Sequence, residues 1–361
     1  MIIGIKRSAG FLGVFLSICS IIGVTSFHAF AQQAKSADAE DVKVDPATVP
    51  IIEGALRYLA DQQLPDGSWS GDKANADIKF PVAMTSYALI AFLANGNLPD
   101  AGPYAKQVTK GLQFLLDSSE SDGMFREKPR QYYMYSHGIA TMVLAEIYGE
   151  TQDPIIRRKL ERALMIIEHS QNPEGGWRYQ PGSKDADLSV TVPQTVALLG
   201  AKRAGIIVPQ VTIDKAIAYI RSLQVNVGNP KYIGFGYQAP VGPGLSRTAA
   251  AIYAIQISGS YDDPLVVKGS SFVADRGIPD YLTYGNYYAA VSLYLVGGDK
   301  WRQYYQKFSK YLLKNAQTNG TMSHWDSSLD SQAKNVGSNW CTAVFTTILS
   351  MPYGYLPLYQ R

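Results

Sequence analysis

Cysteine is scarce in this chain, whose 361 residues contain only Cys19 and Cys341. Cys19 lies in an N-terminal segment that we expect to be removed, so no intrachain disulfide can form, and an oxidising destination would be tolerated but not exploited. The chain also lacks a cluster of lysine and arginine, and its net charge is only +3. A weak and evenly spread positive charge excludes nucleic acid as an expected partner.

Residues 1–31 have the pattern of a signal peptide. Lys6 and Arg7 supply a positive start, and residues 11–24 form an apolar run that is too short to span a membrane as a helix. Ala31 completes a small-x-small cleavage pattern. We therefore expect cleavage near Ala31 and export to the periplasm or the extracellular space, with an uncleaved membrane anchor as the alternative.

The rest of the chain divides into a tether and a repeated region. Residues 32–48 are small and polar with charges of both signs, which predicts a flexible tether. From residue 49 to 361 an apolar helical segment that ends in glutamine, followed by a Gly-x-aromatic turn, returns about every 50 residues. Its clearest copies are Gln63 with Gly67-Ser68-Trp69, Gln171 with Gly175-Gly176-Trp177, and Gln224 with Gly234-Phe235. Repeats of this length indicate stacked helical hairpins, so we expect residues 49–361 to form one domain.

Alignment of the repeats predicts six hairpins, each with an outer and an inner helix. Outer segments are apolar on one face, as at Leu160 and Leu164, whereas inner segments such as 248–255 are apolar nearly all round. The outer helices are expected at 50–63, 104–118, 154–170, 212–224, 264–275 and 302–317, and the inner helices at 82–94, 132–148, 190–204, 246–258, 285–296 and 338–350.

Alternation of half-buried and fully buried helices implies two concentric layers. Six hairpins closed into a ring give an all-α (α/α)6 barrel, or toroid, with the apolar helices inside. An open superhelical solenoid is the alternative, but it leaves one face of the inner helices wet. Closure buries more apolar surface, so the sequence predicts the ring.

The Gln-to-Trp turns resemble the QW repeat of squalene and oxidosqualene cyclases and, more loosely, the repeats of protein prenyltransferase β subunits. The best matches are residues 63–69 and 171–177, and the resemblance covers all six units. Together with the export signal and the C-terminal segment 352–361, the chain resembles the bacterial prenyltransferase/squalene-oxidase (QW) repeat proteins. The resemblance implies an α/α toroid and specifies no reaction.

In such a ring the N-terminal ends of the inner helices, with their unpaired N–H groups, meet at one mouth of the central cavity. Charged groups near an apolar cavity are costly without a purpose. We therefore expect a ligand-binding rim made of His137, Gln194, Arg247, Asn286, Tyr287, Asn339 and Trp340. The alternative is that the rim is polar only because it is wet, with helix capping by Ser136, Thr191, Ser246 and Ser338.

Asp185 and Asp187 precede the third inner helix and are the candidate catalytic residues. They match the first two carboxylates of the D-x-D-D motif with which squalene-hopene-type cyclases protonate an alkene, and the resemblance implies Asp187 as the proton donor. Leu188 stands where that motif has its third carboxylate, which weakens the assignment, because nearby carboxylates raise the pKa of one group and keep it protonated. The alternative is that Asp187 caps the helix N-terminus.

Tyrosine is abundant, at 24 residues, and aromatic side chains can stabilise a carbocation by cation–π attraction. The run 132–135 could line the cavity, and Tyr284, Tyr287 and Tyr288 at the start of an inner helix are expected to do so. Tyr304 and Tyr305 fall on an outer helix, so we expect them to serve packing.

A zinc site is a poorer prediction. The last repeat contains ligand types that hold zinc in protein prenyltransferases, namely His324, Asp326, Asp330 and Cys341. No other cysteine is left after cleavage to complete a thiolate-rich site, and a small buried cysteine explains Cys341 equally well. The chain has neither a DDxxD motif nor a phosphate loop, which argues against prenyl transfer. We expect no metal and no cofactor.

These features predict an exported squalene/terpene-cyclase-like toroid that acts on or binds an apolar isoprenoid-type ligand in a central cavity, with proton-initiated cyclisation as the candidate reaction. The first alternative is a non-catalytic toroid that binds a lipid, a peptide or a partner protein, because the acid motif is incomplete and squalene-type cyclases pair two toroids. The second is an α/α-barrel polysaccharide lyase or hydrolase, which needs a basic cleft or a close carboxylate pair. Association with a membrane surface is compatible with these predictions, and the oligomeric state is not indicated.

Overall fold

The computed structural model describes residues 42–70, 80–127, 133–277 and 281–360. The predicted signal peptide and most of the predicted tether lie outside the described residues. At the end of that tether, Val42 is buried and Pro46–Thr48 form a short 3-10 helix, η1. None of the helices in these four ranges combines the length and the apolar character needed to cross a membrane.

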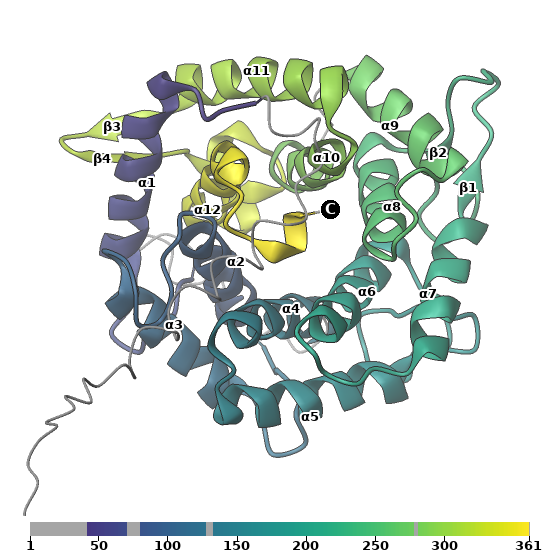
Figure 1. Ribbon diagram of the computed structural model, residues 1–361, viewed down its shortest axis with the longest axis horizontal. Coiled ribbons are helices and arrows are strands. Elements are labelled where there is room, and N and C mark those ends of the chain that lie inside the picture. Colours follow the sequence, from purple (N-terminus) through teal and green to yellow (C-terminus); the bar gives the residue numbers. More distant parts are fainter. Residues whose placement is uncertain (1–41, 71–79, 128–132, 278–280, 361) are drawn as a thin grey trace, which may run out of the picture. The chain divides into compact units, whose positions relative to one another are not determined.

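The described residues form an inner and an outer ring of α-helices (Figure 1), and the prediction of an all-α (α/α)6 toroid is confirmed. The outer helices are α1 (Val49–Gln62), α3 (Ala105–Ser118), α5 (Pro154–Ser170), α7 (Gln210–Ser222), α9 (Pro264–Arg276) and α11 (Gly298–Asn315). The inner helices are α2 (Pro81–Leu93), α4 (Tyr133–Thr151), α6 (Leu188–Arg203), α8 (Leu245–Ile257), α10 (Leu282–Val296) and α12 (Ser338–Ser350).

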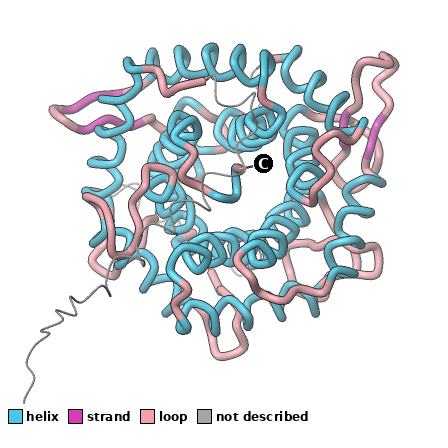
Figure 2. The backbone as a smooth tube through the Cα atoms, in the orientation of Figure 1, coloured by secondary structure: helices cyan, strands magenta, loops and turns pink. Residues whose placement is uncertain are grey.

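Among the described residues, strands form two short antiparallel hairpins at the edge of the rings (Figure 2). One pairs β1 (Gln224–Val225) with β2 (Gly234–Phe235), and the other pairs β3 (Gln317–Asn319) with β4 (Met322–His324). The turn aromatic of the first repeat, Phe235, lies in β2, and that of the second, Trp325, directly follows β4, so the hairpins lengthen a connection without changing the helical architecture.

The ring closes on itself, because the last repeat packs against the first. Helix α12 packs against α2, and α1 packs against both α12 and β4. Arg57 Nε donates to the carbonyl of Thr321 at 2.7 Å, and the Tyr58 ring stacks on His324 with centroids 4.7 Å apart. These contacts join segments more than 260 residues apart in sequence, so the open solenoid is wrong.

Glutamines at the ends of two outer helices, α1 and α5, clamp their hairpins to the next. Gln63 Nε2 donates to the carbonyls of Gly67 and Gln107, both at 2.9 Å. Gln171 repeats this geometry, with Nε2 donating to Gly175 and Thr212 at the same distances. The amide therefore satisfies a carbonyl of its own turn and one of the following outer helix, which is the structural role that a glutamine at a helix C-terminus can play.

A second set of hydrogen bonds fixes how five of the inner helices are rotated about their axes. The backbone N–H of the turn aromatic donates to a side chain in the first turns of the inner helix. The pairs are Trp69 to Thr85 Oγ1 (3.0 Å), Phe125 to His137 Nδ1 (3.2 Å), Trp177 to Thr191 Oγ1 (3.1 Å), Phe235 to Thr248 Oγ1 (3.0 Å) and Trp325 to Thr342 Oγ1 (3.2 Å). We call these five acceptors the acceptor column. It faces outward, towards the turns.

The C-terminal segment closes one end of the inner ring, where helices α4 and α6 end. Its short helix η6 (Pro357–Tyr359) reaches the middle of the ring, in yellow in Figure 1. Leu358 N–H donates to Glu146 Oε2 at 3.1 Å, and Tyr359 shares a 2.9 Å hydroxyl contact with Tyr287. Burial raises the pKa of the Glu146 carboxyl to about 7. This end of the ring is therefore filled.

Thr191→Val tests the acceptor column. The substitution removes the acceptor for the Trp177 N–H and leaves that buried donor unsatisfied, so we expect a loss of about 1–3 kcal/mol in the free energy of unfolding, measured by urea denaturation. Thr195→Val is a matched control on the same helix, since Thr195 Oγ1 only donates to the Thr191 carbonyl at 2.9 Å. Equal losses in the two variants would contradict the special role of Thr191.

Candidate functional site

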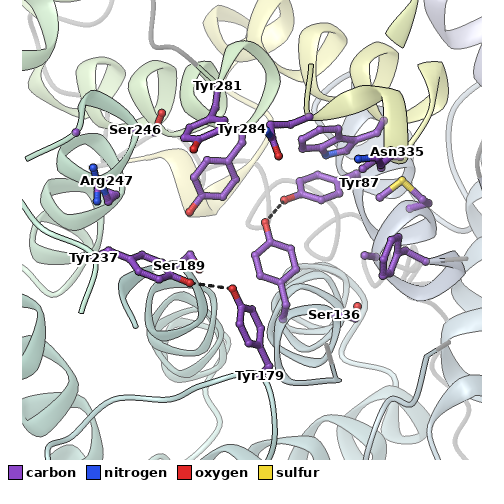
Figure 3. A pocket seen from close by; sticks show the side chains of 18 of the residues that line it. Tyr87, Ser136, Tyr179, Ser189, Tyr237, Ser246, Arg247, Tyr281, Tyr284 and Asn335 are labelled. Carbon is purple, nitrogen blue, oxygen red and sulfur yellow. Dashed lines mark hydrogen bonds between the residues drawn. The ribbon is translucent and has the colours of Figure 1, made fainter. Parts of the chain in front are cut away.

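A cavity of about 800 Å³ lies at the N-terminal ends of the inner helices (Figure 3). This volume is within the usual range of small-molecule pockets. Five inner helices contribute the residue two positions before their outward-facing acceptor, namely Ala83, Tyr135, Ser189, Ser246 and Trp340, and α10, which has no member in the acceptor column, contributes Tyr284. Because a helix turns about 100° per residue, residues two apart point in nearly opposite directions. The acceptor column thus aims this second set, the cavity column, at the centre of the ring.

Tyrosine hydroxyls supply much of the polarity of the cavity. Tyr87 and Tyr135 share a 3.3 Å hydroxyl contact, and Tyr179 and Tyr237 share one at 2.8 Å (Figure 3). Burial raises the pKa of Tyr87, Tyr237 and Tyr284 above the ordinary tyrosine value. These phenols are therefore neutral at physiological pH and act as hydrogen-bond donors and acceptors, not as bases.

The floor of the cavity is aromatic and nearly solid. Deeper in the ring, a residual space of only about 10 Å³ is lined by four tyrosines and four apolar residues, namely Tyr87, Tyr253, Tyr287 and Tyr288 with Ile139, Met142, Pro193 and Val196. The Tyr287 ring meets Tyr288 and Tyr87 edge to face, with centroids 5.1 and 5.9 Å apart. Tyr287, predicted as a rim residue, therefore lies in the floor.

Of the remaining predicted rim residues, Arg247 and Trp340 line the cavity, and His137 does not. His137 is fully buried in the acceptor column, where Nδ1 accepts from Phe125 N–H and Nε2 must therefore donate to the Ala163 carbonyl, 2.9 Å away. Burial lowers the pKa of His137 to about 4, so the imidazole is neutral. Its polarity serves the fold.

Gln194, Asn286 and Asn339 are also absent from the cavity wall, because each is engaged elsewhere. Gln194 Nε2 donates to the Met134 carbonyl at 2.6 Å, where it packs against the bare Cα of Gly138. Asn286 Nδ2 donates to the Leu282 carbonyl at 2.7 Å, and its Oδ1 accepts from the Tyr304 hydroxyl at 2.9 Å. The Asn339 amide donates to the Ser70 carbonyl at 3.0 Å, across the closure of the ring.

The candidate acids do not reach the cavity either. Asp187 is fully buried as the N-cap of α6, where Oδ1 accepts from Val190 N–H at 2.9 Å and from the Ser189 hydroxyl at 2.6 Å. Its Oδ2 is 3.2 Å from Nε of Arg178, and the largely exposed Asp185 is 3.1 Å from Nη1 of the same arginine. Asp187 therefore does not line the cavity, and its carboxylate serves as a helix cap and ion-pair partner, as the capping alternative predicted.

Two more carboxyls cap inner helices from behind the wall. Glu127 Oε1 accepts from Ala83 N–H at the start of α2 (2.9 Å), and burial raises the pKa of this carboxyl to about 7. Asp330 Oδ2 accepts from Thr283 N–H at the start of α10 (2.7 Å). Among the described residues that line the cavity, none is an aspartate or a glutamate.

The residues considered for zinc are spread over separate structural roles. His324 stacks on Tyr58, Asp326 caps a short 3-10 helix (Ser327–Leu329), and Cys341 is buried beside Thr283. Within the described ranges, no three histidine, cysteine, aspartate or glutamate side chains converge in a way that could hold a metal ion.

Tyr179 and Tyr237 are cavity residues that the predicted rim omitted. Each stands two positions after the turn aromatic of its repeat, Trp177 and Phe235, and Glu127 holds the same position after Phe125. This shared position in the repeat could therefore have identified both tyrosines from the sequence. Tyr135 and Tyr284 were both considered as cavity lining, and the structure places both there.

No family model matches the chain. Lanosterol synthase of Saccharomyces cerevisiae is 21% identical over 170 residues, which cover 45% of this chain and 20% of that protein. Lanosterol synthase of Aspergillus fumigatus is 24% identical over 166 residues, with 44% and 20% covered. The chain thus spans about a fifth of the length of these curated relatives, and the sequence relationship is weak.

Solved α/α toroids of several kinds share the fold. Cellobiose 2-epimerase from Bacillus thermoamylovorans matches with a TM-score of 0.63 at 11% identity, covering 85% of this chain and 98% of that one. An α-1,6-mannanase from Salegentibacter matches at 0.60 and 9%, covering 84% and 98%. A type II terpene cyclase from Scytonema matches at 0.56 and 14%, covering 86% and 100%. Together with the weak similarity to lanosterol synthases, these matches support a terpene-cyclase-like α/α toroid.

His137→Thr tests the structural role of the histidine, since threonine is the acceptor in the other four repeats. The unfolded chain protonates His137 near pH 6.5, whereas the folded chain does so only near pH 4, so this residue makes the protein lose stability as the pH falls through that window. Relative to wild type, the variant should gain about 2 kcal/mol between pH 7 and pH 5, measured by urea denaturation at both values. An unchanged difference between the two proteins would contradict the low pKa.

Proposed function

We propose that the toroid binds an apolar, isoprenoid-type ligand in the central cavity and does not cyclise it. The observation that carries the proposal is the composition of the wall: aromatic rings and neutral hydroxyls around about 800 Å³, with no carboxylic acid among the described lining residues. Aromatic faces offer large apolar area to an alkene chain, and isolated hydroxyls fix its orientation.

Cyclisation needs a carboxylic acid in contact with the ligand, and the best candidate is occupied elsewhere. The Asp187 carboxylate holds the N-terminus of α6 and Arg178, with the Ser189 hydroxyl between it and the cavity. Glycoside hydrolysis needs two carboxyl groups that flank the scissile bond, and the described wall supplies neither. The mannanase and epimerase matches therefore bear on the fold alone.

An isoprenoid is favoured over other apolar ligands by the relatives. Lanosterol synthases share sequence with this chain, and the Scytonema terpene cyclase has been solved with its substrate, geranylgeranyl dihydroxybenzoate. The repeated Gln63 and Gln171 clamps also favour assignment to the bacterial QW-repeat proteins. The basic start and the apolar run of residues 1–31 favour export.

Loss of a cavity tyrosine should weaken binding. We expect Tyr284→Leu to lower the affinity for geranylgeraniol about tenfold, because the ring lies in the cavity against Tyr288 at 5.0 Å. Quenching of the fluorescence of Trp340, which lines the cavity, would report binding. Tyr294→Leu is the matched control on the same helix, since its edge-to-face contact at 5.2 Å is with Trp301, outside the cavity. Equal affinities of the two variants would count against the site.

Asp187→Asn separates binding from cyclisation. Asparagine caps a helix about as well as aspartate, so the variant should fold and should bind geranylgeraniol with unchanged affinity. Neither wild type nor variant should convert squalene or geranylgeraniol to a cyclic product, analysed by gas chromatography and mass spectrometry. Turnover by the wild type that is lost in Asp187→Asn would overturn the non-catalytic proposal.

A further inference from the structure

Arg247 stands out among the residues of the cavity wall. It is half-buried, lines the cavity, and has no hydrogen-bond or ion-pair partner in the part of the chain that the structure describes. Its guanidinium folds back over Gly244, where a Cβ would come within 2.7 Å of Nε and 2.8 Å of Nη2. The glycine thus leaves room for the cation directly over the first turn of α8, at the left of the cavity in Figure 3. A charge beside an apolar wall is costly without a counter-ion.

Ser246 is a second, independent observation at the same place. Its side chain lines the cavity although the residue is only 5% exposed, and its hydroxyl has no hydrogen-bond partner among the described residues. The other two serines of the wall are engaged: Ser189 donates to Asp187, and Ser136 bonds the Glu127 carboxylate. The Ser246 hydroxyl is therefore available to a ligand.

The backbone of α8 adds further donors. Its first helical bond runs from Thr248 N–H to the Gly244 carbonyl at 2.9 Å, so the N–H groups of residues 245–247 have no helical acceptor. No side chain of the described residues caps this end. Unpaired N–H groups and the helix dipole together attract an anion at such a terminus.

Three other inner helices have the N-terminal capping acceptor that α8 lacks in the described chain. Carboxylates from Glu127, Asp187 and Asp330 accept from the first-turn N–H groups of α2, α6 and α10. Helix α12 also begins without a side-chain cap, but the Ser338 hydroxyl accepts from Ser327 N–H and Asn339 donates to Ser70. At α8 the corresponding donors face the cavity.

We infer that the ligand carries an anionic oxygen-bearing head, a phosphate or a carboxylate, that binds Arg247, Ser246 and the N-terminus of α8. The inference rests on the proposed function and deepens it. A prenyl chain attached to that head would extend across the cavity towards Tyr284, Tyr135 and Trp340. The ligand class is therefore a prenyl phosphate or a prenyl carboxylate.

The test compares head groups on one chain. Geranylgeranyl phosphate, geranylgeranoic acid and geranylgeraniol would be titrated into the full-length protein, with quenching of Trp340 as the readout. We expect both anions to bind the wild type at least about tenfold more tightly than the alcohol, as charge-assisted hydrogen bonds predict. Arg247→Gln should reduce this preference to less than about threefold.

Two further variants separate a placed guanidinium from net charge. Arg158→Gln removes an exposed arginine of outer helix α5 and should keep the full preference for the anions. Gly244→Ala keeps the charge of Arg247 but displaces its guanidinium, so it should lower the preference. Circular dichroism would verify that every variant is folded.

The outcomes distinguish the inference from the proposed function. Equal affinity of the wild type for phosphate, acid and alcohol would overturn the inference and leave apolar binding standing. An equal loss of preference in Arg158→Gln and Arg247→Gln would also overturn it, because non-specific charge would then explain the effect. Absence of binding by all three compounds would overturn both proposals.

Discussion

The hydrogen bond between a turn N–H and the acceptor column is the constraint on which the rest of this structure depends. A helix that is apolar nearly all round, such as α8, has no hydrophobic face to decide how it rotates about its axis. One buried polar acceptor fixes the rotation of the helix, because the backbone N–H of the turn aromatic would otherwise lose its hydrogen-bond partner. With Thr191 or His137 turned outward, the residue two positions earlier must face the centre. The repeat therefore builds a cavity by fixing rotation.

The same helix ends explain why the cavity is polar and yet poor in acid. Glu127, Asp187 and Asp330 lie behind the wall and cap the N-termini of inner helices. There each side chain accepts from an otherwise unpaired N–H group and interacts favourably with the helix dipole. What remains on the inner surface is a set of tyrosines whose burial keeps the phenols protonated. Neutral phenols of this kind donate and accept hydrogen bonds. Arg247 is the one charged side chain among the described residues that line the cavity, and no carboxylate of the described chain pairs with it.

The fold could be predicted almost entirely from the sequence, and the site only in part. Helical periodicity and the repeat located the helices to within a few residues, and burial of the inner helices favoured closure. The predicted rim failed at His137 and Asn286 because polarity was taken as a sign of ligand contact, whereas both side chains hydrogen-bond other parts of the fold. Gln194 could not be placed, since its contact with Gly138 depends on how α4 and α6 meet. Tyr179 and Tyr237 could have been found only by comparing one position, two residues after the turn aromatic, across the repeats.

Closure of the far end determines how a ligand can lie. The C-terminal segment fills the ring where α4 and α6 end, held by the contact of Tyr359 with Tyr287 and the bond from Leu358 N–H to Glu146. Between this segment and the cavity, the tyrosine floor leaves only a narrow space. A long chain therefore cannot thread through the ring and must enter and leave by the mouth at the inner-helix N-termini. The anionic head group that we infer would then rest beside Arg247, because the N–H donors at the start of α8 lie at that mouth.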